Sequence, residues 1–130
     1  MIVVDSSVLV AALLVDRQFG AWAADAVAGA DLGAPSLAAF EAANIVRRHV
    51  AAGLVDARIA EAAHRDLALL VVEYWPYQAV ATRCWELREN MTIYDAAYVA
   101  VAEATESPLY TLDQRMTTAS GPTCRFVIPP

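Results

Sequence analysis

The stretch Ile2-Val-Val-Asp-Ser-Ser-Val8 contains the transition that decides the fold class. Three β-branched residues, Ile2–Val4, predict a short buried strand that ends at Asp5. Ser6 or Ser7 can cap a helix directly afterwards, which the apolar residues 8–14 begin. A strand that leads straight into a helix is the pattern from which alternating α/β folds are built.

This alternation of strands and helices continues along the chain. Helices are expected over 19–28, 37–52, 77–88 and 93–104, the last of them capped by Thr92. A further helix is expected after its cap Asp56, and Trp75-Pro76 breaks the helical pattern that follows. Strands are expected over 32–34, 109–112 and 125–128. The alternation predicts one α/β domain over residues 1–130, with a parallel sheet flanked by helices.

The composition indicates a water-exposed domain rather than a membrane protein. Hydrophobic residues make up 58% of the chain, above the roughly 45–50% of average domains, but much of the excess is alanine. The longest apolar runs are far shorter than the ~20 residues of a membrane-spanning helix. Asp5 interrupts the opening apolar stretch and no basic residue precedes it, so no signal peptide is indicated. A cytoplasmic protein with no membrane association is therefore expected.

The charge and the cysteines narrow the possible chemistry. The net charge of −6 opposes binding to nucleic acid, although carboxylates neutralised by a bound metal ion would not count toward it. Every Lys or Arg position is arginine, which excludes a mechanism that needs lysine. Cys84 and Cys124 lie in apolar surroundings and indicate core packing rather than a disulfide or a metal site.

Four acidic residues are the candidates for chemistry. Asp5 ends the first predicted strand, and Asp113 directly follows the strand over 109–112. Ligands of open α/β sheets bind outside the carboxyl ends of the strands, so both carboxylates are expected in one crevice. Glu41 and Asp95 each interrupt an otherwise apolar helical stretch.

Taken singly, most of these acids also have a structural interpretation. Asp5 can cap the following helix, Asp113 can cap a short turn, and Thr92-x-x-Asp95 fits a capping box. Glu41 is the hardest to explain in this way, because a carboxylate on a face of core residues needs a partner or a metal ion. Gathered together, the four would repel one another unless a divalent cation neutralised them. Oxygen ligands favour Mg²⁺ or Mn²⁺, and water bound to such an ion can attack a phosphodiester.

Several stretches that contain these acids resemble PIN-domain ribonucleases, and specifically VapC-type toxins of bacterial toxin–antitoxin pairs. They occur in the order typical of that family and span nearly the whole chain. The matching stretches are Ile2-Val-Val-Asp-Ser-Ser-Val8, Phe40-Glu-Ala-Ala-Asn-Ile-Val-Arg47, Trp85-Glu-Leu-Arg-Glu-Asn-Met-Thr-Ile-Tyr-Asp-Ala-Ala-Tyr-Val-Ala100 and Pro108-Leu-Tyr-Thr-Leu-Asp113.

The resemblance implies a PIN-like three-layer α/β/α sandwich with a short, mostly parallel central sheet. It also implies an endoribonuclease that hydrolyses RNA and is inhibited by a cognate VapB-like antitoxin, whose C-terminal segment lies across the acidic groove. A homodimer and a larger toxin–antitoxin assembly are implied as well. One or two Mg²⁺ ions, replaceable by Mn²⁺, would be held by the four acids, most directly by Asp5 and Asp95. Ser6 and Thr111 match positions next to the metal.

The remaining polar and aromatic candidates lie near these stretches. Asn44 is one helical turn beyond Glu41 and is expected to support it. Four arginines are candidates for RNA-phosphate contacts: Arg47, Arg48, Arg88 and Arg115. Trp22, Phe40 and Trp85 have the spacing of core residues on helices, whereas Trp75 and Tyr77 flank Pro76 where an exposed apolar patch would suit a partner.

Two other enzyme classes and one binding class are the alternatives. A haloacid-dehalogenase-type phosphatase would have a second aspartate two residues after Asp5, where this chain has Ser7. A receiver domain would need a lysine after a late strand, and the chain has none. A catalytically silent module with the PIN fold would bind a partner without turnover, but it would not require the complete set of four acids.

Overall fold

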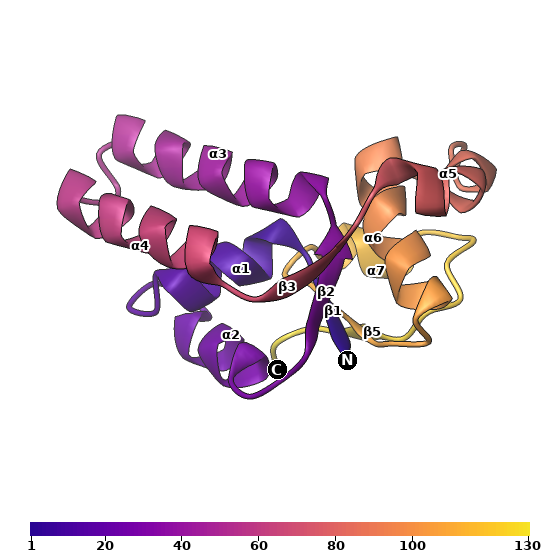
Figure 1. The fold of residues 1–130 in the computed structure, drawn as a ribbon, viewed down its shortest axis with the longest axis horizontal. Helices are drawn as coiled ribbons and strands as arrows, with labels where there is room; N and C mark the ends of the chain where they lie inside the picture. Colours follow the sequence, from indigo (N-terminus) through magenta and orange to yellow (C-terminus); the bar gives the residue numbers. More distant parts are fainter.

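Five parallel strands form the central sheet of the computed structural model, which describes all residues 1–130 (Figure 1). In chain order, the strands are β1 (Ile2–Val4), β2 (Leu32–Pro35), β3 (Val72–Trp75), β4 (Leu109–Tyr110) and β5 (Phe126–Val127). Their order across the sheet is β3-β2-β1-β4-β5, so β1 is central and pairs in parallel with both β2 and β4. The prediction of a parallel sheet is confirmed.

Helices cover both faces of this sheet. They are α1 (Ser6–Leu13), α2 (Gly20–Val27), α3 (Leu37–Ala51), α4 (Ala57–Leu69), α5 (Tyr77–Glu86), α6 (Ile93–Ala104) and α7 (Gln114–Thr118). In Figure 1, α1 to α4 gather on one side of the strands, and α5 and α6 lie on the other. The chain therefore has the three-layer α/β/α arrangement that the family resemblance implied. None of the helices combines the length and the hydrophobicity needed to cross a membrane.

The local signals in the sequence place most helix boundaries correctly. Asp56 and Thr92 are the N-caps of α4 and α6, as predicted, and each accepts a hydrogen bond from a backbone N–H of the first turn. For the first helix, the N-cap is Asp5, which the structural interpretation of that residue allowed, and not Ser6 or Ser7. The side chain of Asp5 accepts the hydrogen bond from the Val8 amide, at 3.1 Å.

Two elements are absent from the sequence prediction. Strand β3 was not predicted, for two reasons. Leu70 and Val71 continue the apolar pattern of α4 as far as Val72, where β3 begins. In addition, β3 is an edge strand in which Glu73 and Tyr74 are exposed. Helix α7 was not expected either. It is a single short helix that Asp113 caps, as one of the interpretations of that residue allowed.

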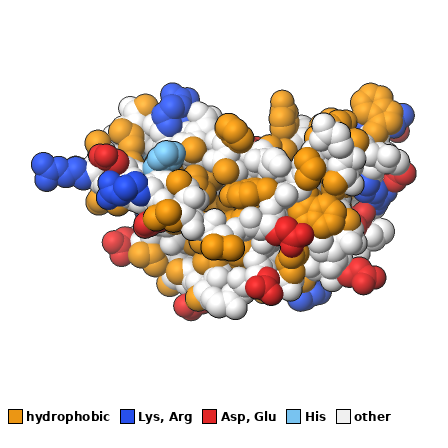
Figure 2. Space-filling view, in the orientation of Figure 1, with side chains coloured by type: hydrophobic (Ala, Val, Ile, Leu, Met, Phe, Trp, Pro, Cys, Tyr) orange, Lys and Arg blue, Asp and Glu red, His pale blue; other side chains and the backbone are white.

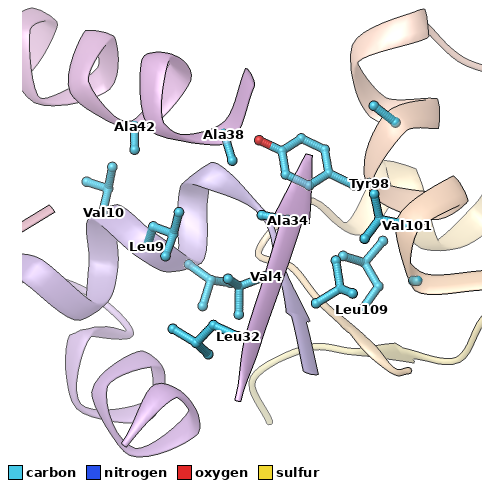
Figure 3. Packing of buried hydrophobic residues seen from close by; sticks show 14 of the residues in the cluster. Val4, Leu9, Val10, Leu32, Ala34, Ala38, Ala42, Tyr98, Val101 and Leu109 are labelled. Carbon is cyan, nitrogen blue, oxygen red and sulfur yellow. The ribbon is translucent and has the colours of Figure 1, made fainter. Parts of the chain in front are cut away.

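The core lies on both faces of the sheet, as Figure 3 shows for residues such as Leu9 and Val4 on one side and Val101 and Leu109 on the other. Helix α6 is buried over seven consecutive residues, Ala96–Ala102, because it packs against β1, β2 and β4 while α5 packs against α6. Alanine suits these positions because it permits close approach of a helix to the sheet. Cys84 lies in this core, as predicted, and Cys124 is half-buried and also free.

The prediction of core packing for three aromatic residues is correct only for Trp22. This side chain packs against the core, and its ring centroid is 5.9 Å from that of Tyr110. Phe40 and Trp85 are instead 80% and 60% exposed. The helical spacing identified an apolar face correctly only where another element covers that face.

A semi-buried ion pair joins α5, α6 and the segment before β5. Arg83 Nε donates to Glu103 Oε2 at 2.6 Å, and Arg83 also donates to the carbonyl oxygen of Gly121 at 2.8 Å. The backbone N–H of Thr123 donates to Glu103 Oε1 at 2.7 Å. Burial opposes ionisation of Glu103, but the hydrogen bonds from Arg83 and Thr123 outweigh it and lower the pKa of Glu103.

We expect Glu103→Gln to lower the free energy of unfolding by about 1.5–3 kcal/mol at neutral pH, the usual range for a hydrogen-bonded charged group. Urea denaturation followed by circular dichroism measures this. The pKa of Glu103 is lower in the folded state, so its contribution is complete above the ordinary glutamate pKa and is lost as the pH falls through the folded value. The matched control is Glu61→Gln, in the exposed pair Glu61–Arg65 at 3.9 Å, which should change little. Equal stability of the two variants would contradict the assignment.

Candidate active site

The four candidate acids lie at one edge of the sheet. Asp5 and Asp113 follow the carboxyl ends of β1 and β4, which are neighbours. Glu41 lies near the start of α3, which follows β2 on the other side of β1, and Asp95 lies in the first turn of α6. The carboxyl ends of adjacent parallel strands are the usual ligand-binding edge of an α/β sheet. The parallel topology thus accounts for how four distant positions in the sequence come to share one region.

Asp5 is the most buried of the four, with 4% of its surface exposed. Its Oδ1 accepts hydrogen bonds from the Ser7 hydroxyl and the Val8 amide, and its Oδ2 accepts one from the Thr111 hydroxyl. Burial raises the pKa of Asp5, and these hydrogen bonds act against the rise. No basic side chain pairs with this carboxylate, so a cation would have a buried, oriented and unneutralised oxygen ligand here.

Glu41 is held by Tyr98, a residue that the sequence analysis did not select. The Tyr98 hydroxyl donates a hydrogen bond to Glu41 Oε1 at 2.6 Å, and the tyrosine is 2% exposed. Figure 3 shows the ring reaching from α6 toward the start of α3, close to Ala38. Burial raises the pKa of Tyr98 strongly, and the hydrogen bond and charge of Glu41 raise it further. The phenol therefore remains a donor at physiological pH.

A sequence signal for Tyr98 was present, because a buried tyrosine hydroxyl requires a partner. Tyr98 lies three residues after Asp95, which places both side chains on one face of α6. The sequence could not identify Glu41 as that partner, since the two residues are 57 positions apart.

Asp95 and Asp113 affect each other through their charges. Burial raises the pKa of Asp95, and the negative charge of Asp113 raises it further, while Arg115 and Thr92 act in the opposite direction. No basic side chain pairs with the carboxylate of Asp95, and its backbone N–H donates to Thr92 Oγ1 at 3.1 Å. Asp113 Oδ1 caps α7 at Arg115 N, 3.0 Å away, and also faces Arg115 Nε at 3.4 Å.

The supporting residues divide into those that touch an acid and those that do not. Thr111 donates to Asp5 and accepts from the Asp113 amide at 2.9 Å, so it links two of the acids. Ser7, which was not selected for the site, donates to Asp5 and accepts from the Leu112 amide at 3.2 Å. Ser6 interacts with Tyr98 instead of Asp5. Asn44 accepts a hydrogen bond from Arg47 at 2.8 Å and makes no hydrogen bond with Glu41.

The candidate arginines are exposed, and only Arg115 contacts one of the four acids. Arg47 is bound to Asn44, and the Arg88 guanidinium lies over the Trp85 ring at 4.7 Å from its centroid. Arg48 makes no side-chain hydrogen bond or ion pair. Of the two residues expected to form an apolar patch for a partner, Tyr77 is exposed and Trp75 is half-buried.

The donor set matches a hard divalent cation in type, but the side chains do not form a closed coordination shell. Nowhere do three or more Asp, Glu, His or Cys side chains lie close enough to hold one ion together. The charges of Glu41 and Asp5 both raise the pKa of Tyr98, and the charge of Asp113 raises the pKa of Asp95. Carboxylate oxygens are nevertheless the ligands that Mg²⁺ and Mn²⁺ prefer, and mutual repulsion together with burial without a counter-charge favours a cation between them.

Comparison with known proteins agrees with this architecture. Residues 2–121 match the PIN domain family. Ribonuclease VapC9 of Mycobacterium tuberculosis is 35% identical over 130 residues, which cover 100% of this chain and 99% of the relative. Ribonuclease VapC12 of the same species is 31% identical over 121 residues, or 93% of each chain.

Two solved structures have the same fold. The crystal structure of Mycobacterium tuberculosis VapC20, a toxin that cleaves the sarcin–ricin loop, superposes with a TM-score of 0.69 at 18% identity. The alignment covers 90% of this chain and 93% of that one, and at this identity it supports the fold alone. PAE2754 from Pyrobaculum aerophilum gives a TM-score of 0.62 at 27% identity over 88% of this chain and 81% of its own. The chain therefore belongs to the PIN-domain family and, within it, to the VapC-type proteins.

Proposed function

We propose that this chain is a metal-dependent endoribonuclease that acts as the toxin of a toxin–antitoxin pair. The observation that carries the proposal is the buried Asp5 carboxylate, held by Ser7 and Thr111 without a counter-charge at the carboxyl edge of a PIN-type sheet. Full-length similarity to ribonuclease VapC9 supports RNA as the substrate class. We assign the whole chain to one catalytic domain.

In this proposal, Asp5 and Asp95 are the most direct ligands of Mg²⁺ or Mn²⁺, and Glu41 and Asp113 complete the site. Such an ion, when bound, acidifies a water molecule and stabilises negative charge on the phosphate. Ser7 and Thr111 hold both oxygens of Asp5 in place, so little side-chain freedom remains to be lost on binding. Tyr98 fixes Oε1 of Glu41 and leaves Oε2 without a protein donor.

The acidic edge also suggests how the activity is restrained. A VapB-like antitoxin that places a basic side chain against Asp5, Asp95 and Asp113 would relieve the same repulsion that a metal ion relieves. Inhibitor and metal would then compete for one cluster of carboxylates. We include homodimerisation of the chain, and a larger assembly with the antitoxin, in the proposal on the basis of its relation to VapC proteins.

The first test concerns metal dependence and the acids. Purified protein should cleave RNA in Mg²⁺ or Mn²⁺ and lose activity in EDTA. Asp5→Asn should reduce the cleavage rate by more than about 100-fold, because even residues that only support a metal ligand contribute about 10–100-fold. The variant should still fold, because asparagine can also cap α1. Asp66→Asn, an exposed acid on α4, is the matched control and should cleave normally. Sequencing of the cleavage ends in total RNA measures cleavage by the wild type and by both variants. Undiminished cleavage in EDTA would exclude the proposed chemistry.

The second test concerns the hydroxyl that positions Glu41. Tyr98→Phe removes the hydroxyl that donates to Glu41 Oε1 and interacts with Ser6. We therefore expect affinity for Mn²⁺ to fall about 10-fold and the cleavage rate to fall with it. Isothermal titration calorimetry with Mn²⁺ measures the affinity independently of turnover. Tyr74→Phe, whose hydroxyl makes no hydrogen bond, is the control. Identical Mn²⁺ affinities for the two variants would show that Tyr98 does not position Glu41.

The third test measures how far the negative charge of Asp95 destabilises the folded protein when no metal ion is bound. Burial and the charge of Asp113 raise the pKa of Asp95 in the folded protein. Ionised Asp95 therefore destabilises the fold when the pH is above this raised pKa. Below the pKa that aspartate has in the unfolded chain, about 4, Asp95 is protonated in both states and has no such effect. In EDTA at neutral pH, Asp95→Asn should therefore unfold at a higher temperature than the wild type. The difference should vanish as the pH falls below 4, and Mg²⁺ should stabilise the wild type more than the variant.

Thermal unfolding monitored by circular dichroism measures these differences, with Asp66→Asn again as the control because it is exposed and remote from the four acids. A neutral-pH gain for Asp66→Asn equal to that for Asp95→Asn would attribute the effect to overall net charge. Lower stability of Asp95→Asn in EDTA would contradict the predicted repulsion.

A further inference from the structure

A cluster of basic side chains lies at the carboxyl end of α3. Arg48 and His49 belong to the last turn of this helix, and Arg17 lies between α1 and α2. Arg17 Nη1 donates to the carbonyl oxygen of Leu54 at 2.9 Å, and the N–H of Leu54 donates to the carbonyl oxygen of His49 at 2.9 Å. Leu54 therefore holds Arg17 beside the end of α3. Figure 2 shows basic side chains at the end of the molecule where α3 passes into α4.

The members of this cluster have no acidic partner. Neither Arg17 nor Arg48 forms an ion pair, and the Nδ1 atom of His49 is buried without a hydrogen-bond partner. Burial lowers the pKa of His49, and the charges of Arg17 and Arg48 lower it further. The preference of basic residues for the last turn of a helix does not explain Arg17, which lies outside α3. In a chain with a net charge of −6, cations that no carboxylate neutralises favour the binding of an anion.

A hollow of about 250 Å³ between α1 and α3 connects this cluster to the candidate active site. Ser7, whose hydroxyl donates to Asp5, lines one end of the hollow, and Arg17 and His49 line the other. Apolar side chains of the two helices form the walls in between. Glu41 and His49 are eight positions apart on α3, which corresponds to about 12 Å along the helix axis. The cluster therefore lies at a distance from the acids, at the other end of one hollow.

We propose that Arg17, Arg48 and His49 form a phosphate-binding subsite that holds the RNA strand a few nucleotides away from the bond that is cleaved. This inference rests on the proposed ribonuclease function and adds to it binding residues that lie outside the four acids. Each guanidinium can donate two parallel hydrogen bonds to the oxygens of a phosphate. Phosphate contacts supply much of the affinity for nucleic acid, so an acidic chain needs a local cluster of this kind.

An acidic segment of a protein partner is the competing occupant. RNA is favoured because one strand presents successive phosphates to the two arginines, whereas an acidic side chain brings a single charge. The hollow also leads to the acids, where the substrate must lie in the proposed function. The other arginines considered for phosphate contacts are each engaged by a side chain of the protein, which leaves Arg48 free among them.

RNA binding measured without cleavage tests the subsite. A fluorescein-labelled single-stranded RNA of mixed sequence is titrated with the full-length protein in EDTA at several NaCl concentrations, and fluorescence anisotropy gives Kd. Arg48→Gln and Arg17→Gln should each raise Kd several-fold. Each should also reduce the slope of the logarithm of the binding constant against the logarithm of salt concentration by about 0.7, the value for one phosphate contact with a single strand. Arg48 makes no hydrogen bond or ion pair, so its replacement should leave the fold intact.

The matched control is Arg125→Gln, which removes the same charge from an exposed side chain directly before β5, at the amino edge of the sheet. Its Kd and salt slope should equal those of the wild type. In steady-state cleavage, Arg48→Gln should raise KM and leave kcat unchanged. Wild-type Kd and slope for both Arg17→Gln and Arg48→Gln would overturn the inference. An equal loss for Arg125→Gln would also overturn it, because the effect would then come from net charge.

Inorganic phosphate tests the anion site without RNA and separates this inference from the proposed function. The chain has two histidines, whose ring signals nuclear magnetic resonance can follow. Sodium phosphate should shift the signals of His49 but not those of His64, relative to NaCl at equal ionic strength and pH, and Arg48→Gln should reduce this shift. An unshifted His49 would overturn the anion site even in an active ribonuclease.

Two further outcomes assign the cluster or the function differently. A His49 response to phosphate together with unchanged RNA affinity in both arginine variants would overturn the RNA assignment and leave an acidic partner segment as the occupant. A His49 response and arginine-dependent RNA binding in a protein that cleaves no RNA in Mn²⁺ would overturn the proposed function, while the phosphate-binding subsite would stand.

Discussion

The position of the Asp5 carboxylate is the constraint on which the rest of the structure depends. This one side chain caps α1 through the Val8 amide and accepts hydrogen bonds from Ser7 and Thr111. It therefore connects the carboxyl end of β1 to the residue that follows β4 and fixes where α1 leaves the sheet. Asp5 can be both a helix cap and the metal ligand that we propose. The two roles are compatible because the hydrogen bonds that Asp5 accepts as a cap also orient its carboxylate. Both roles follow from burial at the end of the central strand.

This arrangement concentrates negative charge at one edge of the sheet, where Arg115 is the basic side chain that contacts one of the four acids, Asp113, at 3.4 Å. Asp5 has no ionic partner, and Asp95 and Asp113 repel each other. The Arg83–Glu103 pair shows the opposite case, in which an acid of similar partial burial is fully neutralised and its pKa is lowered. The two clusters therefore differ: Glu103 belongs to a structural ion pair, whereas the buried carboxylate of Asp5 has no basic partner. Acids whose pKa is raised by burial and by a neighbouring like charge are typical of functional sites.

Helix α6 joins the core to the site. Its run of alanines packs against the sheet, and the same close approach brings Tyr98 within 2.6 Å of Glu41 on α3. The residues at the start of α6 are less buried and present Asp95 and Tyr94 at the edge. A single helix thus supplies packing along most of its length and carries the candidate acid Asp95 in its first turn.

Sequence alone was sufficient for the α/β class and for the helix caps Asp56 and Thr92, because these depend on periodicity and on local residue chemistry. It also singled out the four acids as candidates, and their role remains a proposal. It did not reveal β3, whose exposed edge position weakens the apolar pattern, and it assigned Phe40 and Trp85 to the core because spacing cannot show whether a face is covered. Only the tertiary structure identified Ser7 and Tyr98 as the partners of Asp5 and Glu41. It also showed Asp5 buried without a counter-charge, since the parallel order of β2, β1 and β4 is what brings these distant residues to one edge.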